Sequence, residues 1–250
     1  VMMAWEQDYM RSLVDELRID SSCAVLEIGF GLGISATHIL AQQPASYTCI
    51  EPDPTVLQRL REWREQWTEG CTAVSIAEGT WQEKLPNLGF FDCIFFDDCP
   101  TPNTVNEYYR DSIYDDEERW QCFVDSCLGC HMRSGARITG YLSARRGNLR
   151  ALKAHSCEVT VRPYSLSCPP VGCPYWPDHQ RTAYIPLIKL LGDHTQGQRP
   201  PACGAAAVHT RRKRRLGLKE RFARKVCTKV GLVEEESREE AKVGAEAEAA

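Results

Sequence analysis

The stretch Leu26-Glu27-Ile28-Gly29-Phe30-Gly31-Leu32-Gly33 decides the fold of this chain. A short apolar run from Cys23 to Ile28 leads into it and predicts a buried strand, and Ile34 to Ala41 then has the pattern of a helix. A strand that turns at once into a helix beside a ligand needs residues without a Cβ, which the glycines supply. The segment therefore predicts a strand–loop–helix unit with a ligand at the carboxyl end of a sheet, although a glycine turn alone also has a purely structural interpretation.

Two acids near the loop indicate which class of ligand it binds. Glu51 ends the next predicted strand, Tyr47 to Ile50, where a carboxylate can accept both hydroxyls of an adenosine ribose. Nicotinamide enzymes and methyltransferases both use this geometry. The dinucleotide pattern has a further Gly or Ala where Ile34 stands, so a pyrophosphate fits poorly. Glu27, just before the first glycine, favours a ligand that carries a cationic amino acid, as in methyltransferases.

The rest of the chain continues the alternation of strands and helices. Helices are predicted over 5–17, 54–67, 117–128 and 146–155, and strands over 73–77, 91–96, 136–141, 157–164 and 183–191. This order predicts an α/β, Rossmann-like fold with a doubly wound, mostly parallel sheet and an antiparallel hairpin at its end. We expect the folded domain to cover residues 1–191.

Residues 192–250 have a different composition. The basic run Arg211 to Arg215 is followed by more basic residues and then by a Glu- and Ala-rich end. Separated charge blocks with few large apolar groups do not offset the entropy of ordering, so we expect a disordered tail. The basic run is compatible with a nuclear address or a nucleic-acid patch, but a solvated extension is the favoured interpretation, and no nucleic-acid partner is expected beyond that run.

Composition and cysteine content limit the class of protein. The 250 residues have a net charge of -4, and no stretch has the ~20 consecutive apolar residues of a membrane span. The 13 cysteines lack a regular framework and the first residues do not resemble a secretory signal, so a reduced, cytoplasmic protein is predicted, a monomer or weak homodimer. Cys127, Cys130 and His131 resemble half of a zinc site, with Cys168 and Cys173 as distant partners, but the two spacings differ. We therefore expect buried or incidental thiols and no metal.

Several motifs together resemble the guanidinoacetate N-methyltransferase family. They are Val1-Met2 with Trp5-Glu6 and Tyr9-Met10, then Val25 to Gly31, Gln58 to Trp63, Gly79-Thr80-Trp81, Phe91-Asp92 to Phe96-Asp97, Cys168-Pro169-Pro170, Cys173-Pro174-Tyr175 and Ile185-Pro186-Leu187. The resemblance spans roughly residues 1–191. Fungal arginine N-methyltransferases, which act on the δ-nitrogen of arginine, share the Gly-Phe-Gly and Trp-Gln-Glu features.

The resemblance implies a class I methyltransferase that binds S-adenosylmethionine and releases S-adenosylhomocysteine. Its cofactor site would consist of Met2, Met10, Glu27, Gly29, Phe30, Gly31, Glu51, Gly79 and Thr80. Within this set, Glu51 would hold the ribose, and Gly79 and Thr80 would border the adenine. Glu6 and Asp97 would grip the guanidino group of a small-molecule substrate, and backbone groups near Leu142 and Ser143 would receive its carboxylate.

The chemistry of methyl transfer explains two acids at the substrate. A guanidinium is planar and cationic, so two carboxylates can fork it by paired hydrogen bonds and fix its plane. Asp97, at the end of a very apolar strand, is the candidate base for the proton that the nitrogen loses, and Glu6 is the clamp. Asp98 is the nearest rival, but alternation along the strand points it the other way. Without the resemblance, Glu6 would be an ordinary surface acid and Met10 a core residue.

These features predict methylation of guanidinoacetate to creatine. Two alternatives stay open. Arginine in a protein could be the acceptor, although the ankyrin-like front domain of the fungal relatives is absent from these residues. The chain could also be a degenerate, non-catalytic module that binds the cofactor or partners; the retained acids Glu6, Glu51 and Asp97 argue against decay.

Overall fold

A computed structural model of the chain describes residues 6–67, 70, 72–98, 116–142, 157–166 and 181–191. Its strands are β1 (Ala24–Ile28), β2 (Ser46–Glu51), β3 (Ala73–Glu78), β4 (Phe91–Phe96), β5 (Met132–Gly140), β6 (Cys157–Ser165) and β7 (Thr182–Leu190). Its helices are α1 (Gln7–Glu16), α2 (Ile34–Ala41), α3 (Pro54–Glu65), the short α4 (Trp81–Lys84) and α5 (Asp116–Cys127), and a 3-10 turn, η2, covers Leu85–Asn87.

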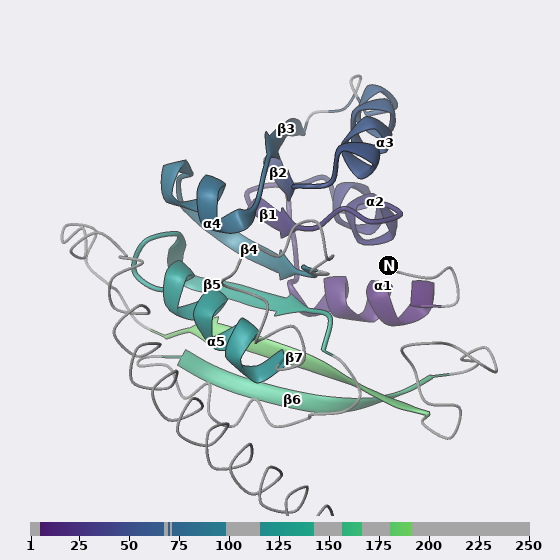
Figure 1. Cartoon of the computed structure of the whole chain (residues 1–250). Helices are drawn as coiled ribbons and strands as arrows, with labels where there is room; N and C mark the ends of the chain where they lie inside the picture. The colour runs from purple at the N-terminus through teal and green to yellow at the C-terminus, as the bar shows by residue number, and fades with distance from the viewer. Residues whose placement is uncertain are drawn as a thin grey trace, which may run out of the picture. The chain divides into compact units, whose positions relative to one another are not determined.

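The strands form one sheet of seven in the order β3-β2-β1-β4-β5-β7-β6 (Figure 1). The first five strands in this order run parallel to one another. β7 pairs antiparallel with both β5 and β6. The doubly wound, mostly parallel sheet with an antiparallel hairpin at its end is therefore confirmed. The strand order reverses between β1 and β4, and in such sheets ligands bind at the carboxyl ends of the strands beside that point.

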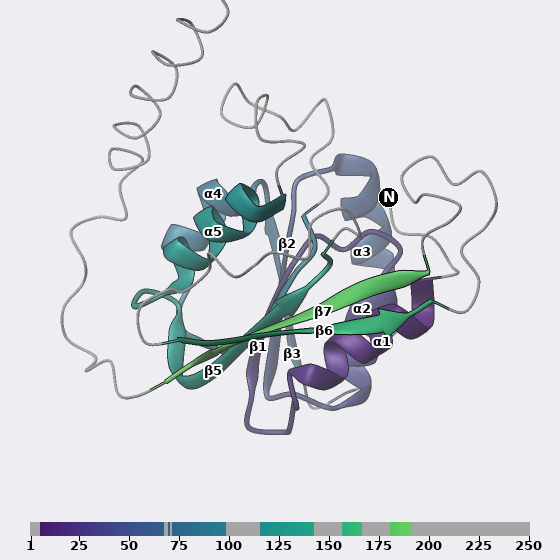
Figure 2. The same cartoon turned by 90° about the horizontal axis from the view of Figure 1, so that it is seen from below.

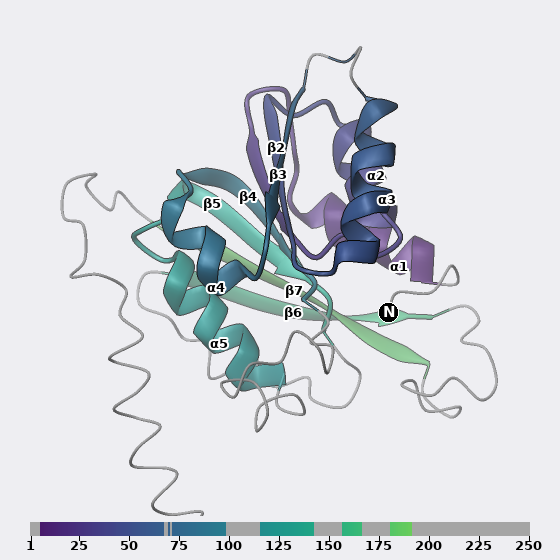
Figure 3. The same ribbon diagram turned by 45° about the horizontal axis from the view of Figure 1, so that its top comes forward.

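Helices cover the two faces of the sheet separately. Figures 2 and 3 show α1, α2 and α3 over one face and α4 and α5 over the other. Successive side chains of β4 point to opposite faces of the sheet. Cys93 and Phe95 pack in the core under α1, α2 and α3. Ile94 and Phe96 pack in the core under α4 and α5. All four side chains are fully buried. This double burial explains why the β4 sequence is continuously apolar rather than alternating.

Local sequence signals account for the α3 boundary. The Asp53 carboxylate accepts hydrogen bonds from the backbone N–H groups of Thr55 and Val56, at 2.9 and 3.1 Å. Pro54 follows at the first helical position, where its missing N–H leaves no bond unmade. The cap fixes the start of α3 immediately after the β2 acid Glu51, so this acid stays at the end of its strand.

Three local predictions differ from the structure or lie outside it. β5 begins at Met132 instead of residue 136, so Ser134 and Gly135 lie inside the strand. Gly135 has a φ of +77° there, which permits the strand to bulge, and the register with β4 shifts between Phe91 and Cys93. The predicted turn at Gly79-Thr80-Trp81 leads directly into α4. The predicted helix over 146–155 and the predicted tail, 192–250, lie outside the described residues.

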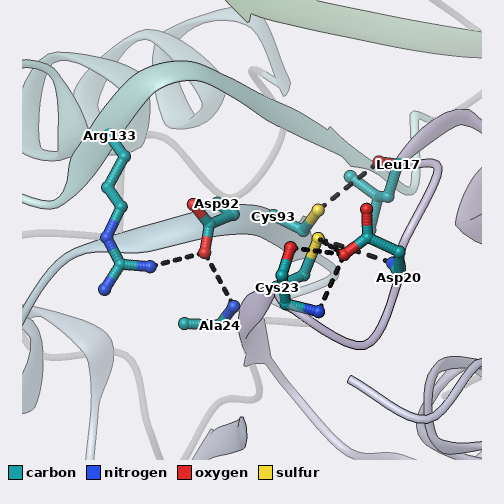
Figure 4. A network of polar contacts seen from close by, with 8 residues as sticks. Leu17, Asp20, Cys23, Ala24, Asp92, Cys93 and Arg133 are labelled. Carbon is teal, nitrogen blue, oxygen red and sulfur yellow. Dashed lines mark hydrogen bonds and ion pairs between the residues drawn. The ribbon is translucent and has the colours of Figure 1, made fainter. Parts of the chain in front are cut away.

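A polar network fixes the amino ends of β1 and β4, at the edge opposite the glycine loop (Figure 4). One oxygen of Asp92 accepts the backbone N–H of Ala24 at 2.7 Å and also binds Arg133, with an N–O distance of 2.5 Å. Beside it, the Cys93 thiol donates to the Leu17 carbonyl at 3.4 Å. These contacts tie β1, β4 and β5 together far from the carboxyl ends where a ligand is expected.

In the described part of the chain, no helix has both the length and the apolar character needed to cross a membrane.

Candidate active site

The glycine loop after β1 lies directly against the end of β4. Gly29, Gly31 and Gly33 have φ values of +83°, +55° and +75°, a region that side chains with a Cβ rarely adopt. A Cβ on Gly29 would lie 2.3 Å from the backbone oxygen of Asp97. The N–H of Asp97 in turn donates to the Ile28 carbonyl at 3.0 Å. The loop and the β4 acid are therefore parts of one site, and a larger residue at Gly29 would separate them.

Glu51 ends β2 beside this loop. Its Oε2 accepts the Phe30 N–H at 2.9 Å and its Oε1 accepts the Asp53 N–H at 2.8 Å. Burial raises the pKa of this carboxyl, and the two backbone hydrogen bonds oppose the rise. Each carboxylate oxygen retains capacity for another donor, so the group that shapes the loop can also accept ribose hydroxyls. Its predicted role at the ribose stays a prediction.

Glu27 lies below the loop and has no exposed surface. The hydroxyl of Ser35 donates to its Oε1, and the hydroxyl of Tyr47 donates to its Oε2. Burial raises the pKa of Glu27 to about 8, with smaller contributions from the charges of Asp97 and Glu51. The carboxyl thus binds protein hydroxyls from α2 and β2, so any effect of Glu27 on a cofactor would act through the loop above it.

Gly79 and Thr80 follow β3 at the same edge. The Gly79 N–H donates to the Glu51 carbonyl at 3.0 Å, which places this turn next to the β2 acid. The Thr80 N–H binds the Glu83 carboxylate at 3.1 Å, and α4 begins at the following residue. The segment that the family resemblance assigns to the adenine therefore adjoins the acid that is predicted to hold the ribose.

The charges of Glu6 and Asp97 both act on one side chain, Tyr9. Burial raises the pKa of the Tyr9 phenol well above its usual value, and the charges of Asp97 and Glu6 raise it further. Glu6 is only 1% exposed and directly precedes α1. The opening helix and the end of β4 thus bring their acids to the same side of the sheet. The neighbouring Asp98 lies on the opposite side, since its Oδ2 accepts the indole N–H of Trp81, a residue of the second core, at 3.0 Å.

The other predicted contacts divide into three groups. Leu142, just after β5, is fully buried, and its backbone hydrogen-bonds with Tyr9. Met10 and Phe30 are buried in the core under α1, α2 and α3, and the Phe30 ring meets Trp63 edge-on with 5.3 Å between ring centroids. Phe30 can therefore face a ligand only through its backbone. Met2 and Ser143 lie outside the described residues.

Comparisons with known proteins relate the first part of the chain to a family. The family model of guanidinoacetate N-methyltransferase matches residues 1–115. The chain is related to this family. The match contains Met2, Glu6, the glycine loop, Glu51, Gly79, Thr80 and Asp97. The relation to the guanidinoacetate N-methyltransferase family that the motifs indicated is thereby confirmed for this part of the chain, whereas Leu142 and Ser143 lie beyond the matched residues.

The curated relatives are named protein arginine N-methyltransferase 2 and not guanidinoacetate N-methyltransferase. Protein arginine N-methyltransferase 2 of Eremothecium gossypii is 39% identical over 121 residues, which are 45% of this chain and 27% of that protein. The protein of the same name from Aspergillus oryzae is 34% identical over 131 residues, 49% of this chain and 31% of that protein. The matched residues thus span less than a third of either relative.

Solved structures support the fold. The N-methyltransferase NodS from Bradyrhizobium japonicum superposes with a TM-score of 0.54, covering 75% of this chain and 97% of that protein, at 12% sequence identity. At this identity the likeness shows the Rossmann-like methyltransferase fold alone.

Cys127, Cys130 and His131 were the candidate metal ligands in the sequence. The part of the chain that the structure describes contains no group of three or more His, Cys, Asp or Glu side chains arranged to hold a metal ion. His131 is hydrogen-bonded through Nδ1 to the Gly89 carbonyl at 3.1 Å, and Cys127 is buried in the second core. Cys168 and Cys173 lie outside the described residues.

Sequence reasoning missed three residues of this site: Tyr9, Ser35 and Tyr47. Tyr9 entered only as part of the Tyr9-Met10 motif, with no role at the site, although its spacing of three from Glu6 places both on one helix face. Ser35 and Tyr47 bind Glu27 from two different elements, so no local pattern joins them.

Proposed function

We propose that this chain is an S-adenosylmethionine-dependent N-methyltransferase that acts on a guanidino group, with guanidinoacetate as its acceptor. The observation that carries the proposal is that the charges of Glu6 and Asp97 both act on the Tyr9 phenol, while the Asp97 backbone lies against the glycine loop. Two neighbouring carboxylates repel each other, and a planar cation that hydrogen-bonds with both relieves that repulsion. The family match over residues 1–115 supports the same reaction.

The residues around the loop fit the proposed cofactor. Left-handed glycines leave room where a Cβ would meet backbone, and Glu51 lies against the loop with acceptor capacity for ribose hydroxyls. The residues that would hold the cofactor are Met2, Met10, Gly29, Phe30, Gly31, Glu51, Gly79 and Thr80, with Glu27 supporting them from below. The bound cofactor supplies a methyl group that is already activated on a sulfonium. No metal takes part in the proposed reaction.

The two acids then bind the acceptor and handle its proton. Guanidinium nitrogens are poor nucleophiles, because their lone pairs are delocalised over the group. Paired hydrogen bonds to Glu6 and Asp97 fix the plane of the group and draw its charge toward the carboxylates, which is positioning catalysis. Asp97 accepts the proton that the reacting nitrogen loses, and Glu6 holds the plane. Backbone groups at Leu142 and Ser143 receive the acceptor's carboxylate.

The test uses the full chain, labelled S-adenosylmethionine and guanidinoacetate. Labelled creatine is the expected product. Asp97→Asn removes the base but keeps the shape of the side chain, so turnover should fall to background while S-adenosylhomocysteine still binds in calorimetry. Asp98→Asn is the matched control, because Asp98 lies on the opposite side of the strand and binds Trp81. Normal turnover in Asp97→Asn would remove Asp97 from the role of base.

Arginine in a protein is the second candidate acceptor, because the curated relatives are named protein arginine N-methyltransferase 2. The same two acids would bind its guanidino group. Incubation with ribosomal proteins and labelled cofactor discriminates: protein-bound label without labelled creatine would favour this acceptor. A non-catalytic module is the third candidate, and it predicts no methyl transfer to either acceptor. A chain that fails to bind S-adenosylhomocysteine would contradict both enzyme proposals.

A further inference from the structure

Tyr9 is an unusual core residue, because its polar end is as deeply buried as its ring. The side chain is 1% exposed. Its ring packs against Tyr141 and Tyr164, with centroids 5.9 and 5.3 Å away. Packing alone does not require the hydroxyl, and burying one is unfavourable unless it is hydrogen-bonded. The position of the hydroxyl therefore needs a separate explanation.

The hydroxyl of Tyr9 connects three elements at the ligand edge of the sheet. It donates to the backbone carbonyl of Tyr184 in β7 and hydrogen-bonds with the backbone of Leu142, just after β5. β5 and β7 are antiparallel neighbours, so the end of one and the start of the other lie side by side. Tyr9 itself belongs to α1. A single oxygen thus fixes where the opening helix sits on the strand ends.

The same oxygen is within reach of the charges of both proposed acceptor acids. Glu6 precedes Tyr9 by three residues and shares its helix face. Asp97 ends β4, the strand next to β5. Burial and the charges of Asp97 and Glu6 raise the pKa of the phenol, so it stays protonated and keeps its donated hydrogen bond.

We infer that Tyr9 is a positioning residue of the acceptor site, which sets the distance between Glu6 and the ends of β4 and β5. This inference rests on the proposed function. The hydroxyl does not touch the reacting atoms. It holds the start of α1 against Leu142 and Tyr184, and so holds Glu6 in place relative to the strand end that carries Asp97. Without the hydroxyl, the ring would still pack but the clamp would loosen.

Tyr9→Phe in the full chain tests the inference, because it removes the hydroxyl and keeps the ring. Tyr164→Phe is the matched control, since it removes a hydroxyl from the ring that packs against Tyr9. Calorimetry measures the affinity for S-adenosylhomocysteine and then, with that ligand bound, for guanidinoacetate and an arginine-containing peptide. Tyr9→Phe should bind the guanidino compounds about tenfold more weakly, as expected for loss of about 1.4 kcal/mol of hydrogen bonding. Its affinity for S-adenosylhomocysteine should stay within about twofold, and Tyr164→Phe should match the wild type in both.

Two further readouts separate positioning from simple stabilisation. In Tyr9→Phe, the KM for the acceptor should rise more than kcat falls. A double-mutant cycle with Glu6→Gln should be non-additive for acceptor binding, because both changes act on the same clamp.

Each contrary outcome has a distinct meaning. Wild-type acceptor affinity in Tyr9→Phe would overturn the positioning role and leave the proposed function standing. Equal loss of acceptor and S-adenosylhomocysteine binding would show that the hydroxyl holds the fold rather than the acceptor, and would also overturn it. A wild-type chain that binds S-adenosylhomocysteine but neither guanidino compound would refute the proposed acceptor class, and the positioning role with it.

Discussion

The buried carboxyl of Glu27 makes the stability of this fold depend on pH, and Glu27→Gln should remove the part of that dependence that Glu27 causes. The side chain has no exposed surface, and hydroxyls of Ser35 and Tyr47 donate to its two oxygens. Burial raises its pKa from 4.5 to about 8. The folded chain therefore binds this proton more tightly than the unfolded chain does, so raising the pH removes stability.

The sign and the size of the effect follow from these two pKa values. Below pH 4.5 the carboxyl is protonated in both the folded and the unfolded chain, so it does not make the free energy of unfolding depend on pH. Between pH 4.5 and about 8 the unfolded chain releases the proton and the folded chain keeps it, so the free energy of unfolding falls as pH rises. Above about pH 8 the loss is complete. A tenfold difference in proton affinity is worth about 1.4 kcal/mol, so the loss between pH 5 and pH 8 is about 3 kcal/mol.

Urea unfolding of wild type and Glu27→Gln at several pH values measures this loss. Glutamine has nearly the same shape and does not ionise, so the variant should gain about 3 kcal/mol relative to the wild type between pH 5 and pH 8. Tyr47→Phe is the opposing control, because it removes a hydrogen bond that lowers the Glu27 pKa. It should extend the pH-dependent loss to higher pH. A difference between wild type and Glu27→Gln that stays constant within about 1 kcal/mol would refute the reasoning.

Two further predictions concern the two ends of the sheet. Gly29→Ala should lose about 1–3 kcal/mol of stability and most of its S-adenosylhomocysteine affinity, because its Cβ would lie 2.3 Å from the Asp97 backbone oxygen at a φ of +83°. In thermal unfolding and calorimetry, Gly89→Ala is its control, since nothing lies within 4 Å of that Cβ, and equal behaviour of the two variants would contradict the prediction. At the other end, Asp92→Asn should lower unfolding free energy by about 1–2 kcal/mol by weakening the contacts to Ala24 and Arg133, with KM unchanged. A raised KM there would mean that the amino edge of the sheet influences the site.

The fold was predictable because its signals are local. The glycine run, the apolar strand before it and the Asp53-Pro54 cap each specify their own backbone, and alternation of strands and helices then limits the topology. The start of β5 was not predictable in this way. Ser134 and Gly135 have turn chemistry, but pairing with β4 extends the strand through them and leaves the glycine as a bulge. Tertiary pairing outweighed local preference at that point.

The site was only partly predictable for the same reason. Glu51 and Asp97 could be identified because strand ends at one edge of a parallel sheet must lie together. Glu6 needed the family resemblance, since an acid at the start of an amphipathic helix is ordinarily solvated. The partners of Glu27 and Tyr9 come from α2, β2, β7 and the end of β5, and these meet only after the chain has folded.

The acids at this edge give the fold a reason to bind cations. Burial raises the pKa of both Glu27 and Tyr9, the charge of Asp97 adds to both shifts, and Glu51 adds to that of Glu27, so the charges around the loop act on one another in a poorly solvated space. Such crowding destabilises the folded chain, because each carboxylate disfavours ionisation of the next. An apolar residue in place of Glu27 would avoid this repulsion, so core packing alone does not explain an acid at this position. Ligands that bring a sulfonium, an ammonium and a guanidinium to this edge would neutralise the same charges. The acidic charge at this edge and the cationic groups of the proposed ligands are therefore complementary.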